Sequence, residues 1–310
     1  MKNINLINFI SLCSVLFLSA CGGTSPLRQT QHWGGATLHA IILADTNDTS
    51  IGKSAEVDLQ KMGGWVESIS GHTGLKTRKY YLSGNNFTYH NITTTLNELS
   101  IMGNDVVIFY YAGHGKNPET KTRWPSMSIE ENFLDFKSVV NTLESKNPRL
   151  FLAFADTCNG FSNDRFYFSQ PRTSARGMER TENYRQLFLN AQGYVIASGA
   201  KPGQLSWSNS KDGGFFTNQF LWNLETELAS RSKPSWTAII KRTKRPINVP
   251  SGDLQEPQYK VNIVGETSLV TTPAIGHDND LDGENDLEFQ WLFEKPQHPS
   301  QNESDDTIWH

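Results

Sequence analysis

The sequence has few cysteines and no excess of basic charge. Its 310 residues include 3 cysteines, 28 Lys and Arg and 32 Asp and Glu, which gives a formal net charge of −4. Because no basic helix and no basic patch with interleaved aromatic residues is visible, nucleic acid is excluded as the expected partner. The length and composition predict one soluble α/β domain with a sizeable core and shorter accessory segments.

Long apolar runs are also absent, apart from "LINFISLCSVLFLSA" near the N-terminus. This run follows Lys2 and is too short to span a bilayer comfortably, so a secretory signal is the better interpretation. It ends in "LSAC", which resembles the bacterial lipobox, whose cysteine is lipidated after cleavage. We therefore expect a lipoprotein signal peptide over residues 1–20, a polar tether over 21–36 and a lipid on Cys21. A plain signal peptide cut nearby is the alternative.

Export would leave a single unmodified thiol. Cys13 would leave with the signal peptide and Cys21 would carry lipid, so only Cys158 remains and no internal disulfide is possible. A single free thiol in an oxidising compartment is open to oxidation unless it is buried or has a chemical role. Gly22 is not the aspartate that typically retains lipoproteins in the inner membrane, so we expect a cell-envelope lipoprotein of the outer membrane.

Apolar runs alternate with segments of helical periodicity from residue 37 onward. The pattern predicts strands over 37–44, 75–84, 105–112, 149–156 and 191–200, and helices over 53–70, 92–99, 136–143 and 213–230. Strands that alternate with helices favour a three-layer α/β/α sandwich with a mostly parallel sheet. An Arg-rich segment over 161–180 and an acidic tail over 265–310 fall outside the alternation.

Two loops that leave predicted strands carry residues suited to nucleophilic catalysis. "YYAGHG" places His114 just beyond one strand, and "FADTCNG" places Cys158 just beyond the next. Neighbouring parallel strands would bring both to one sheet edge, where imidazole favours the thiolate and protonates a leaving amine. The N–H groups of Gly115 and Cys158 could bind an oxyanion. A core cysteine and a satisfied histidine are the alternative.

The segments "YYAGHG" and "FADTCNG" resemble the histidine and cysteine motifs of the caspase and metacaspase peptidases. The cysteine follows the histidine by 44 residues, close to the caspase spacing of about 50. "PGQLSWSNSKDGGFF" is similar to the family's substrate-binding loop, and "QEPQY" is similar to its closing strand. The resemblance implies a caspase-like domain over residues 37–264 and a cysteine endopeptidase that requires no cofactor, although calcium activates many metacaspases.

Departures from the animal caspases indicate the subtype. Those enzymes cleave after aspartate with a glutamine and an arginine at positions that hold Asp156 and Ser208 here. An acidic pocket would instead attract a basic side chain. Metacaspases have an aspartate at the first position and a second one on the first helix, where this chain offers Asp58, with Asp45 as the alternative. We therefore expect protein or peptide substrates that are cleaved after Arg or Lys.

The resemblance also assigns the walls of the pocket. Ser206, Trp207 and Ser208 would bind substrate, with Trp207 beside an apolar subsite. The alternative role for Asp156 is to cap the turn after its strand.

The two remaining segments suggest regulation. Arg172, Arg176 and Arg180 are candidates for self-cleavage where the family has its inter-subunit linker, and a solvated loop that is never cut is the alternative. The tail follows the spacing of calcium loops but has Phe289 where a bidentate glutamate would complete an EF-hand, so an acidic disordered tail is the alternative. Its candidate ligands are Asp278, Asp280, Asp282 and Asp286.

Two functions compete with the peptidase. A catalytically silent caspase-like lipoprotein would act as a binding module, although the presence of both His114 and Cys158 argues against it. A transpeptidase or toxin-processing protease would use the same pair of residues on another acceptor.

Overall fold

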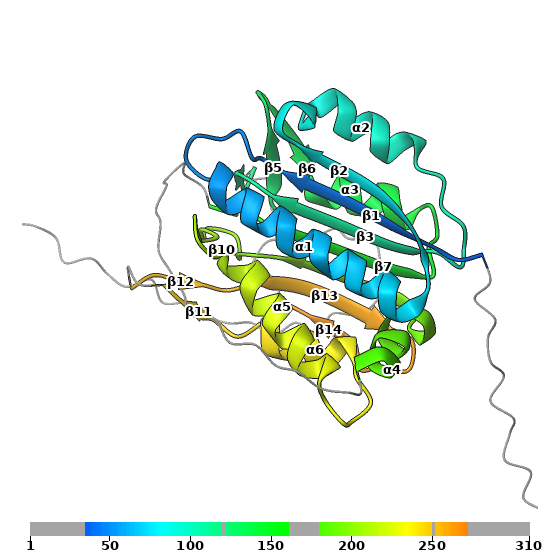
Figure 1. Cartoon of the computed structure of the whole chain (residues 1–310). Coiled ribbons are helices and arrows are strands. Elements are labelled where there is room, and N and C mark those ends of the chain that lie inside the picture. The colour runs from blue at the N-terminus through cyan, green and yellow to red at the C-terminus, as the bar shows by residue number, and fades with distance from the viewer. Residues whose placement is uncertain (1–34, 119–121, 161–179, 250–251, 272–310) are drawn as a thin grey trace, which may run out of the picture.

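The computed structural model describes residues 35–118, 122–160, 180–249 and 252–271. A seven-stranded sheet forms its centre, in the order β14-β13-β8-β7-β3-β1-β2 (Figure 1). Parallel pairing joins β2, β1, β3, β7 and β8, whereas β13 runs antiparallel to both β8 and β14. The strands are β1 (Thr37–Ala44), β2 (Lys76–Ser83), β3 (Val106–Ala112), β7 (Leu150–Asp156), β8 (Gly193–Ser198), β13 (Gln258–Ile263) and β14 (Leu269–Val270).

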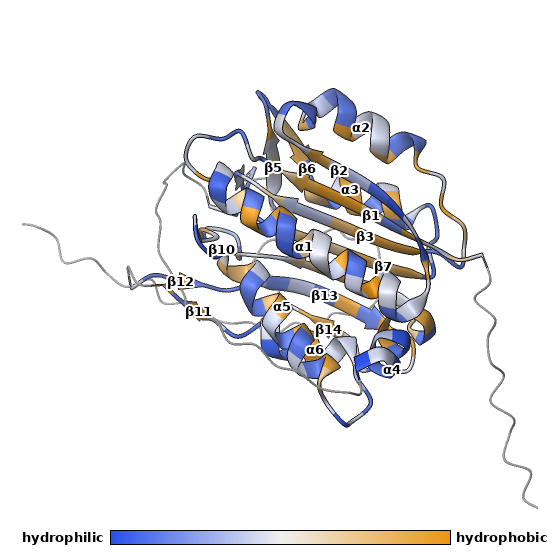
Figure 2. Cartoon of the chain, in the orientation of Figure 1, coloured by the Kyte–Doolittle hydropathy of each residue, from blue (hydrophilic) through white to orange (hydrophobic). Residues whose placement is uncertain are grey.

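The central strands are apolar because both of their faces are covered. Every residue of β3 and β7 is buried, and so are seven of the eight residues of β1. Figure 2 shows hydrophobic residues concentrated on these strands. A parallel strand covered on both sides produces a continuous apolar run in the sequence. The predicted fold class is therefore confirmed.

Helices cover the two faces of the sheet and complete three layers. One core contains Trp65, Phe220 and Ile239 between the sheet and one set of helices, and a second contains Ile92 and Phe136 on the other face. The first set comprises α1 (Gly52–Thr73), α4 (Arg180–Arg185), α5 (Phe215–Leu228) and α6 (Trp236–Thr243). The second comprises α2 (Tyr89–Glu98) and α3 (Phe136–Glu144). A 3-10 turn, η1 (Gly84–Asn86), and a π-helical turn, η2 (Gln186–Asn190), are also present.

Three small antiparallel sheets were not predicted from the sequence. Their strands are two to four residues long, which is too short for a period-two pattern to be visible. They consist of β4 (Gly115–Lys116), β5 (Ser126–Ile129) and β6 (Asn132–Asp135), of β9 (Ser208–Asn209) and β10 (Gly213–Gly214), and of β11 (Ile247–Asn248) and β12 (Leu254–Gln255).

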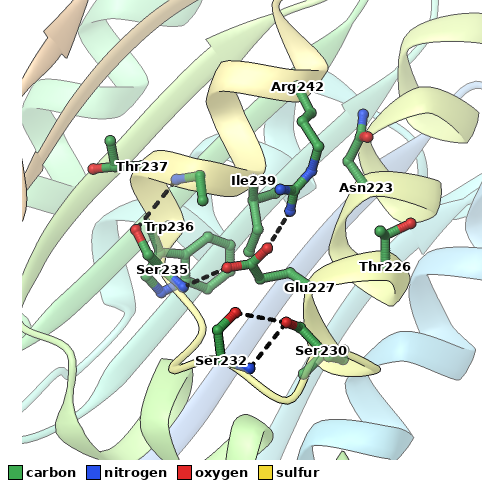
Figure 3. A network of polar contacts seen from close by, with 12 residues as sticks. Asn223, Thr226, Glu227, Ser230, Ser232, Ser235, Trp236, Thr237, Ile239 and Arg242 are labelled. Carbon is green, nitrogen blue, oxygen red and sulfur yellow. Dashed lines mark hydrogen bonds and ion pairs between the residues drawn. The ribbon is translucent and has the colours of Figure 1, made fainter. Parts of the chain in front are cut away.

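A polar network joins the end of α5 to the start of α6 (Figure 3). The Glu227 carboxylate accepts a hydrogen bond from the Ser235 backbone N–H at 3.0 Å and another from the Arg242 guanidinium. The Ser235 hydroxyl accepts a hydrogen bond from the Ala238 N–H at 3.2 Å and thereby caps α6. The buried Trp236 donates to the Leu187 carbonyl at 3.1 Å. These bonds fix the short helix α6 against the larger one.

Some expectations fall at or beyond the limits of the described residues. Arg180, which we expected in an open linker, is the first residue of α4 and forms an ion pair with Glu225 at 2.7 Å. The sheet continues past residue 264 into β14.

Among the described residues, no helix combines the length and apolar character needed to cross a membrane. The expected lipid site Cys21, the cleavage candidates Arg172 and Arg176, and the four tail aspartates Asp278, Asp280, Asp282 and Asp286 lie outside the described ranges.

Candidate active site

The ends of β3 and β7 place His114 and Cys158 at one edge of the sheet. The two strands pair in parallel, with Ala112 opposite Asp156, so each candidate lies two residues beyond a paired position. Hydrogen bonds join the two loops, because the Asn117 backbone N–H donates to the Gly160 carbonyl at 3.0 Å. The loops therefore leave the sheet together.

Backbone contacts hold His114 in place. Its carbonyl accepts hydrogen bonds from the Ser128 N–H at 2.8 Å and from the Tyr111 hydroxyl at 2.6 Å. A Cβ on Gly115 would lie 2.3 Å from Thr157 Oγ1 and 3.1 Å from the Cys158 carbonyl oxygen. Only glycine allows this approach, so the segment after the histidine packs directly against the cysteine loop.

Two cavities meet at this pair of residues. The first is narrow, with a volume of about 50 Å³, and its lining includes His114, Cys158, Asp156 and Asp58. The second is wide, with a volume of about 800 Å³, and also touches His114 and Cys158. The first is suited to one extended side chain and the second to a longer part of a chain. His114 and Cys158 lie where the two cavities meet.

The surroundings of Cys158 favour the protonated thiol. Its Sγ donates a weak hydrogen bond to the Ser206 carbonyl at 3.6 Å. Burial is the main reason why the pKa of the thiol is raised to about 11, with the charge of Asp156 acting in the same direction and the hydrogen bond to the Ser206 backbone acting against it. A reaction at this sulfur would therefore begin from the protonated thiol.

This thiol state predicts how Cys158 reacts with iodoacetamide. The alkylation rate of the wild-type chain should rise about tenfold per pH unit from pH 7 to about 10, because the thiolate fraction grows until the pH reaches the raised pKa. Mass spectrometry of the peptide that contains Cys158 measures the rate, with a small free thiol as the reference. A rate that levels off below pH 8 would instead indicate a preformed thiolate.

Two buried carboxylates converge at the base of the narrow cavity. Asp58 comes from α1 and is 2 % exposed, and Asp156 ends β7 and is 7 % exposed. The Gly214 N–H donates to both carboxylate oxygens of Asp58, at 3.0 and 2.9 Å. A Cβ on Gly214 would lie 2.0 Å from Asp156 Oδ2 and 3.0 Å from Asp58 Oδ2. The two acids therefore approach the same glycine from two elements.

Asp156 is held by hydrogen bonds on both oxygens. Oδ1 accepts from the Ser206 hydroxyl at 2.6 Å. Oδ2 accepts from the Thr217 N–H at 2.9 Å and from its hydroxyl at 2.6 Å. The Tyr110 hydroxyl lies 2.7 Å from Thr217 Oγ1, and it also hydrogen-bonds to the Asp58 carboxyl. The Asp156 side chain thus contacts α5 and the loop before β9, and Thr217 links it to β3.

Burial makes the acid pair costly to ionise. It raises the pKa of both carboxyl groups, and the charge of Asp156 raises that of Asp58 further. Hydrogen bonds and the charge of Lys61 lower both pKa values without cancelling the effect of burial. The Lys61 ammonium donates to the Asp212 carbonyl and to the Asn218 side chain. A second cation would be bound favourably here, since a buried charge needs an opposite partner.

The acid pair predicts that Asp58→Asn stabilises the fold near neutral pH. The folded state holds the carboxyl proton more tightly than the unfolded chain does, so the free energy of unfolding falls as pH rises above about 4 through the raised pKa. Asparagine still accepts from Gly214 but carries no charge. We expect a gain of about 1 kcal/mol at pH 7.5, or about 2–4 °C in Tm. Calorimetry measures it, and a gain that did not shrink at pH 4 would contradict the electrostatic cause.

The loop before β9 closes the narrow cavity. Ser206, Trp207 and Ser208 line it, as does Ser54 of α1, whose hydroxyl lies 3.0 Å from that of Ser208. Trp207 is only 4 % exposed and packs in the core, so it supports the wall from behind as well as facing the cavity. No arginine stands in this triplet.

Gln255 was missed by sequence reasoning. Its side chain is fully buried, accepts from the Trp207 N–H at 2.9 Å and donates to the Ser206 hydroxyl and to the Gly199 carbonyl, each at 2.9 Å. It therefore positions the hydroxyl that binds Asp156. The only signal was its place at the start of "QEPQY", since a single buried glutamine produces no pattern.

Asp45 does not belong to the acid pair. It lines the wide cavity, whereas Asp58 lines the narrow one. The structure thus places the two candidates for the second acid in different cavities, with Asp58 in the one that Asp156 also lines. Within the ranges given above, no group of three or more His, Cys, Asp or Glu side chains could hold a metal ion.

A family model described as the caspase domain matches residues 39–266. The chain belongs to the caspase family. The match covers the acid pair, both loops at the strand ends and every strand of the central sheet except β14 and the first two residues of β1. Family membership implies a cysteine peptidase that acts on proteins.

Two solved structures of low sequence identity are similar to the chain. Caspase-1 from Spodoptera frugiperda is 16% identical, with a TM-score of 0.44, over 72% of this chain and 86% of that one. A protein from Geobacter sulfurreducens is 17% identical, with a TM-score of 0.44, over 72% of this chain and 91% of that one. No curated protein matches the chain significantly.

Proposed function

We propose that this caspase-family protein is a cysteine endopeptidase that cleaves after Arg or Lys. Cys158 is the nucleophile, His114 is the general base and acid, and the Gly115 N–H binds the oxyanion. Asp58 and Asp156 bind the cation of the substrate. The convergence of these two buried carboxylates on Gly214, in a cavity lined also by His114 and Cys158, carries the proposal.

The chemistry follows from the order of proton transfers. Sγ of Cys158 attacks the carbonyl carbon of the basic residue while its proton passes to His114. The C–N bond breaks, and the same proton passes to the leaving amine. Water then attacks the thioester with His114 as base, which releases the carboxylate product and restores the thiol. The Gly115 N–H stabilises the oxyanion in both steps.

Fluorogenic peptides that end in Arg, Lys or Asp test the specificity. Wild type should cleave the Arg and Lys peptides and not the Asp peptide. Asp156→Asn and Asp58→Asn should each lower kcat/KM for the basic peptides by about 100-fold or more, because a buried cation would lose a charged partner.

Cys158→Ala is the control for contaminating proteases and should abolish cleavage. Preference for the Asp peptide would overturn the assignment of the acid pair. Retention of activity in Cys158→Ala would overturn the catalytic assignment.

Self-cleavage between the two halves of the domain is part of the proposal. Arg172 and Arg176 precede α4, and cleavage there would leave the dyad on one fragment and the acid-binding Gly214 on the other. Arg180 is the weaker candidate because it is in α4 and paired with Glu225. Intact-mass spectrometry of wild type should give two fragments, and Cys158→Ala should remain whole. Fragments from both would show that another protease cuts the chain.

Lipid attachment at Cys21, anchoring in the outer membrane and calcium binding by the tail remain predictions from the sequence. No cofactor takes part in the proposed steps.

A further inference from the structure

The loop between β1 and α1 provides polar contacts to the imidazole ring of His114. Its Nε2 lies 3.0 Å from the Ser50 hydroxyl oxygen and 3.4 Å from Asp48 Oδ1. The Ser50 hydroxyl also donates to Asp48 Oδ1. This cluster of three side chains lies beside the proposed dyad, yet nothing in the proposed reaction uses Asp48 or Ser50.

The hydrogen bonds assign the tautomer of His114. The single hydroxyl hydrogen of Ser50 is used on Asp48, so Ser50 Oγ can only accept from Nε2. Asp48 Oδ1 is likewise an acceptor. Nε2 therefore carries the hydrogen of the neutral ring, and Nδ1 holds the lone pair. A base that must take the thiol proton needs that free lone pair.

Asp48 is anchored rigidly enough to fix the ring. Its Oδ1 also accepts hydrogen bonds from the backbone N–H groups of Ser50 at 2.7 Å and Ile51 at 2.9 Å, at the entrance to α1. The side chains of Asp48 and His114 are 18 % and 25 % exposed, so solvent screens the pair only in part.

Asp48 is also negatively charged at any working pH. Burial raises the pKa of its carboxyl, but the hydrogen bonds from Ser50 and Ile51 and the charge of His114 outweigh burial and lower it to about 2. The carboxylate therefore faces the ring both before and after the ring takes a proton. An imidazolium formed during the reaction gains more from this charge than the neutral ring does.

We propose that Asp48, bridged by Ser50, is a positioning residue that completes a Cys158–His114–Ser50–Asp48 relay. It holds the neutral ring in the Nε2–H form and stabilises the imidazolium that forms when His114 takes the Cys158 proton. The proton stays on the ring until it passes to the leaving amine, and Asp48 remains ionised throughout. The inference rests on the proposed function, because it assigns roles within the same site.

Asp48→Asn separates charge from shape, because asparagine can still accept the hydrogen bonds of Ser50 and Ile51. We expect kcat to fall about 10- to 100-fold with KM nearly unchanged, since the lost interaction is strongest in the transition state. The acidic limb of the pH profile should move to lower pH, because the imidazolium loses a neighbouring negative charge. Ser50→Ala should give a partial loss of kcat.

Other charged groups near the ring stay in place in these variants. The wide cavity is also lined by Asp45, Lys116, Glu130 and Glu131, and the narrow cavity by Asp58 and Asp156.

Asp135→Asn is the matched control. Asp135 caps α3 by accepting from the Ser138 N–H and hydroxyl, each at 2.8 Å, which is a comparable carboxylate cap that lines neither cavity. It should keep wild-type kcat and an unmoved pH profile. A kcat loss in Asp48→Asn no larger than in this control, or an unmoved acidic limb, would overturn the proposal.

Nitrogen-15 NMR of histidine-labelled full chain reads the tautomer without any substrate. His114→Gln identifies the signal. Wild type should show the Nε2–H form, and Asp48→Ala should shift it toward Nδ1–H, because the freed Ser50 hydroxyl can then donate to Nε2. An Nδ1–H form in wild type would overturn the relay. Failure of the proposed peptidase would appear separately, as an absence of peptide cleavage by wild type with the tautomer still readable.

Discussion

The structure of the site depends on bringing two buried carboxylates of like charge together at Gly214. Asp58 is supplied by α1 and Asp156 by β7, and both approach Gly214, which has no side chain and donates its N–H to Asp58. Glycine is required on steric grounds, since a Cβ would lie 2.0 Å from Asp156 Oδ2. The β9–β10 hairpin, the start of α5 and the packing of α1 on the sheet all serve this approach.

Holding the pair costs stability, and the surrounding hydrogen bonds offset part of that cost. Asp156 receives three side-chain and backbone donors, and Gln255 orients one of them from β12. Donors stabilise the carboxylates but leave a negative site with no cation of its own in the cavity lining. Active sites commonly contain charged groups that are held together at a cost in stability, and a bound partner of opposite charge relieves that cost.

The sequence predicted the parts of the fold that rest on long, regular patterns. The strands around residues 37–44, 106–112 and 150–156 are continuous apolar runs because the sheet is covered on both faces, and α1 and α5 are long enough to show helical spacing. Helix α6 has only eight residues, so its periodicity was too weak, although Ser235 is a good N-cap. The short hairpins depend on tertiary contacts, which no local pattern records.

The residues of the candidate site divide in the same way, into those that a local pattern predicts and those that depend on tertiary contacts. His114, Cys158 and Asp156 could be predicted because the first two follow apolar strands and the third ends one, at the edge where a parallel sheet gathers its loops. The cavity that Asp45 lines could not be predicted, because a loop residue has no periodicity from which to infer its direction. Asp48 and Ser50 lie in the same polar stretch, "DTNDTS", and their role depends on how that loop folds back to His114. The spacing of Asp48 before α1 does suggest a helix entrance, but not which side chain it meets.

Specificity and reactivity are coupled through the charge of Asp156. That charge is one of the reasons why the Cys158 thiol is hard to ionise in the free protein. Under the proposed function, a substrate guanidinium or ammonium in the narrow cavity neutralises the acid pair, which removes this obstacle at the moment when the scissile carbonyl reaches the sulfur. Burial remains the largest cause of the raised thiol pKa, and an uncharged or acidic side chain would leave the charge of Asp156 to add to it. Under the proposed function, the pocket would thus select a basic residue twice, once by binding it and once by making the nucleophile easier to form.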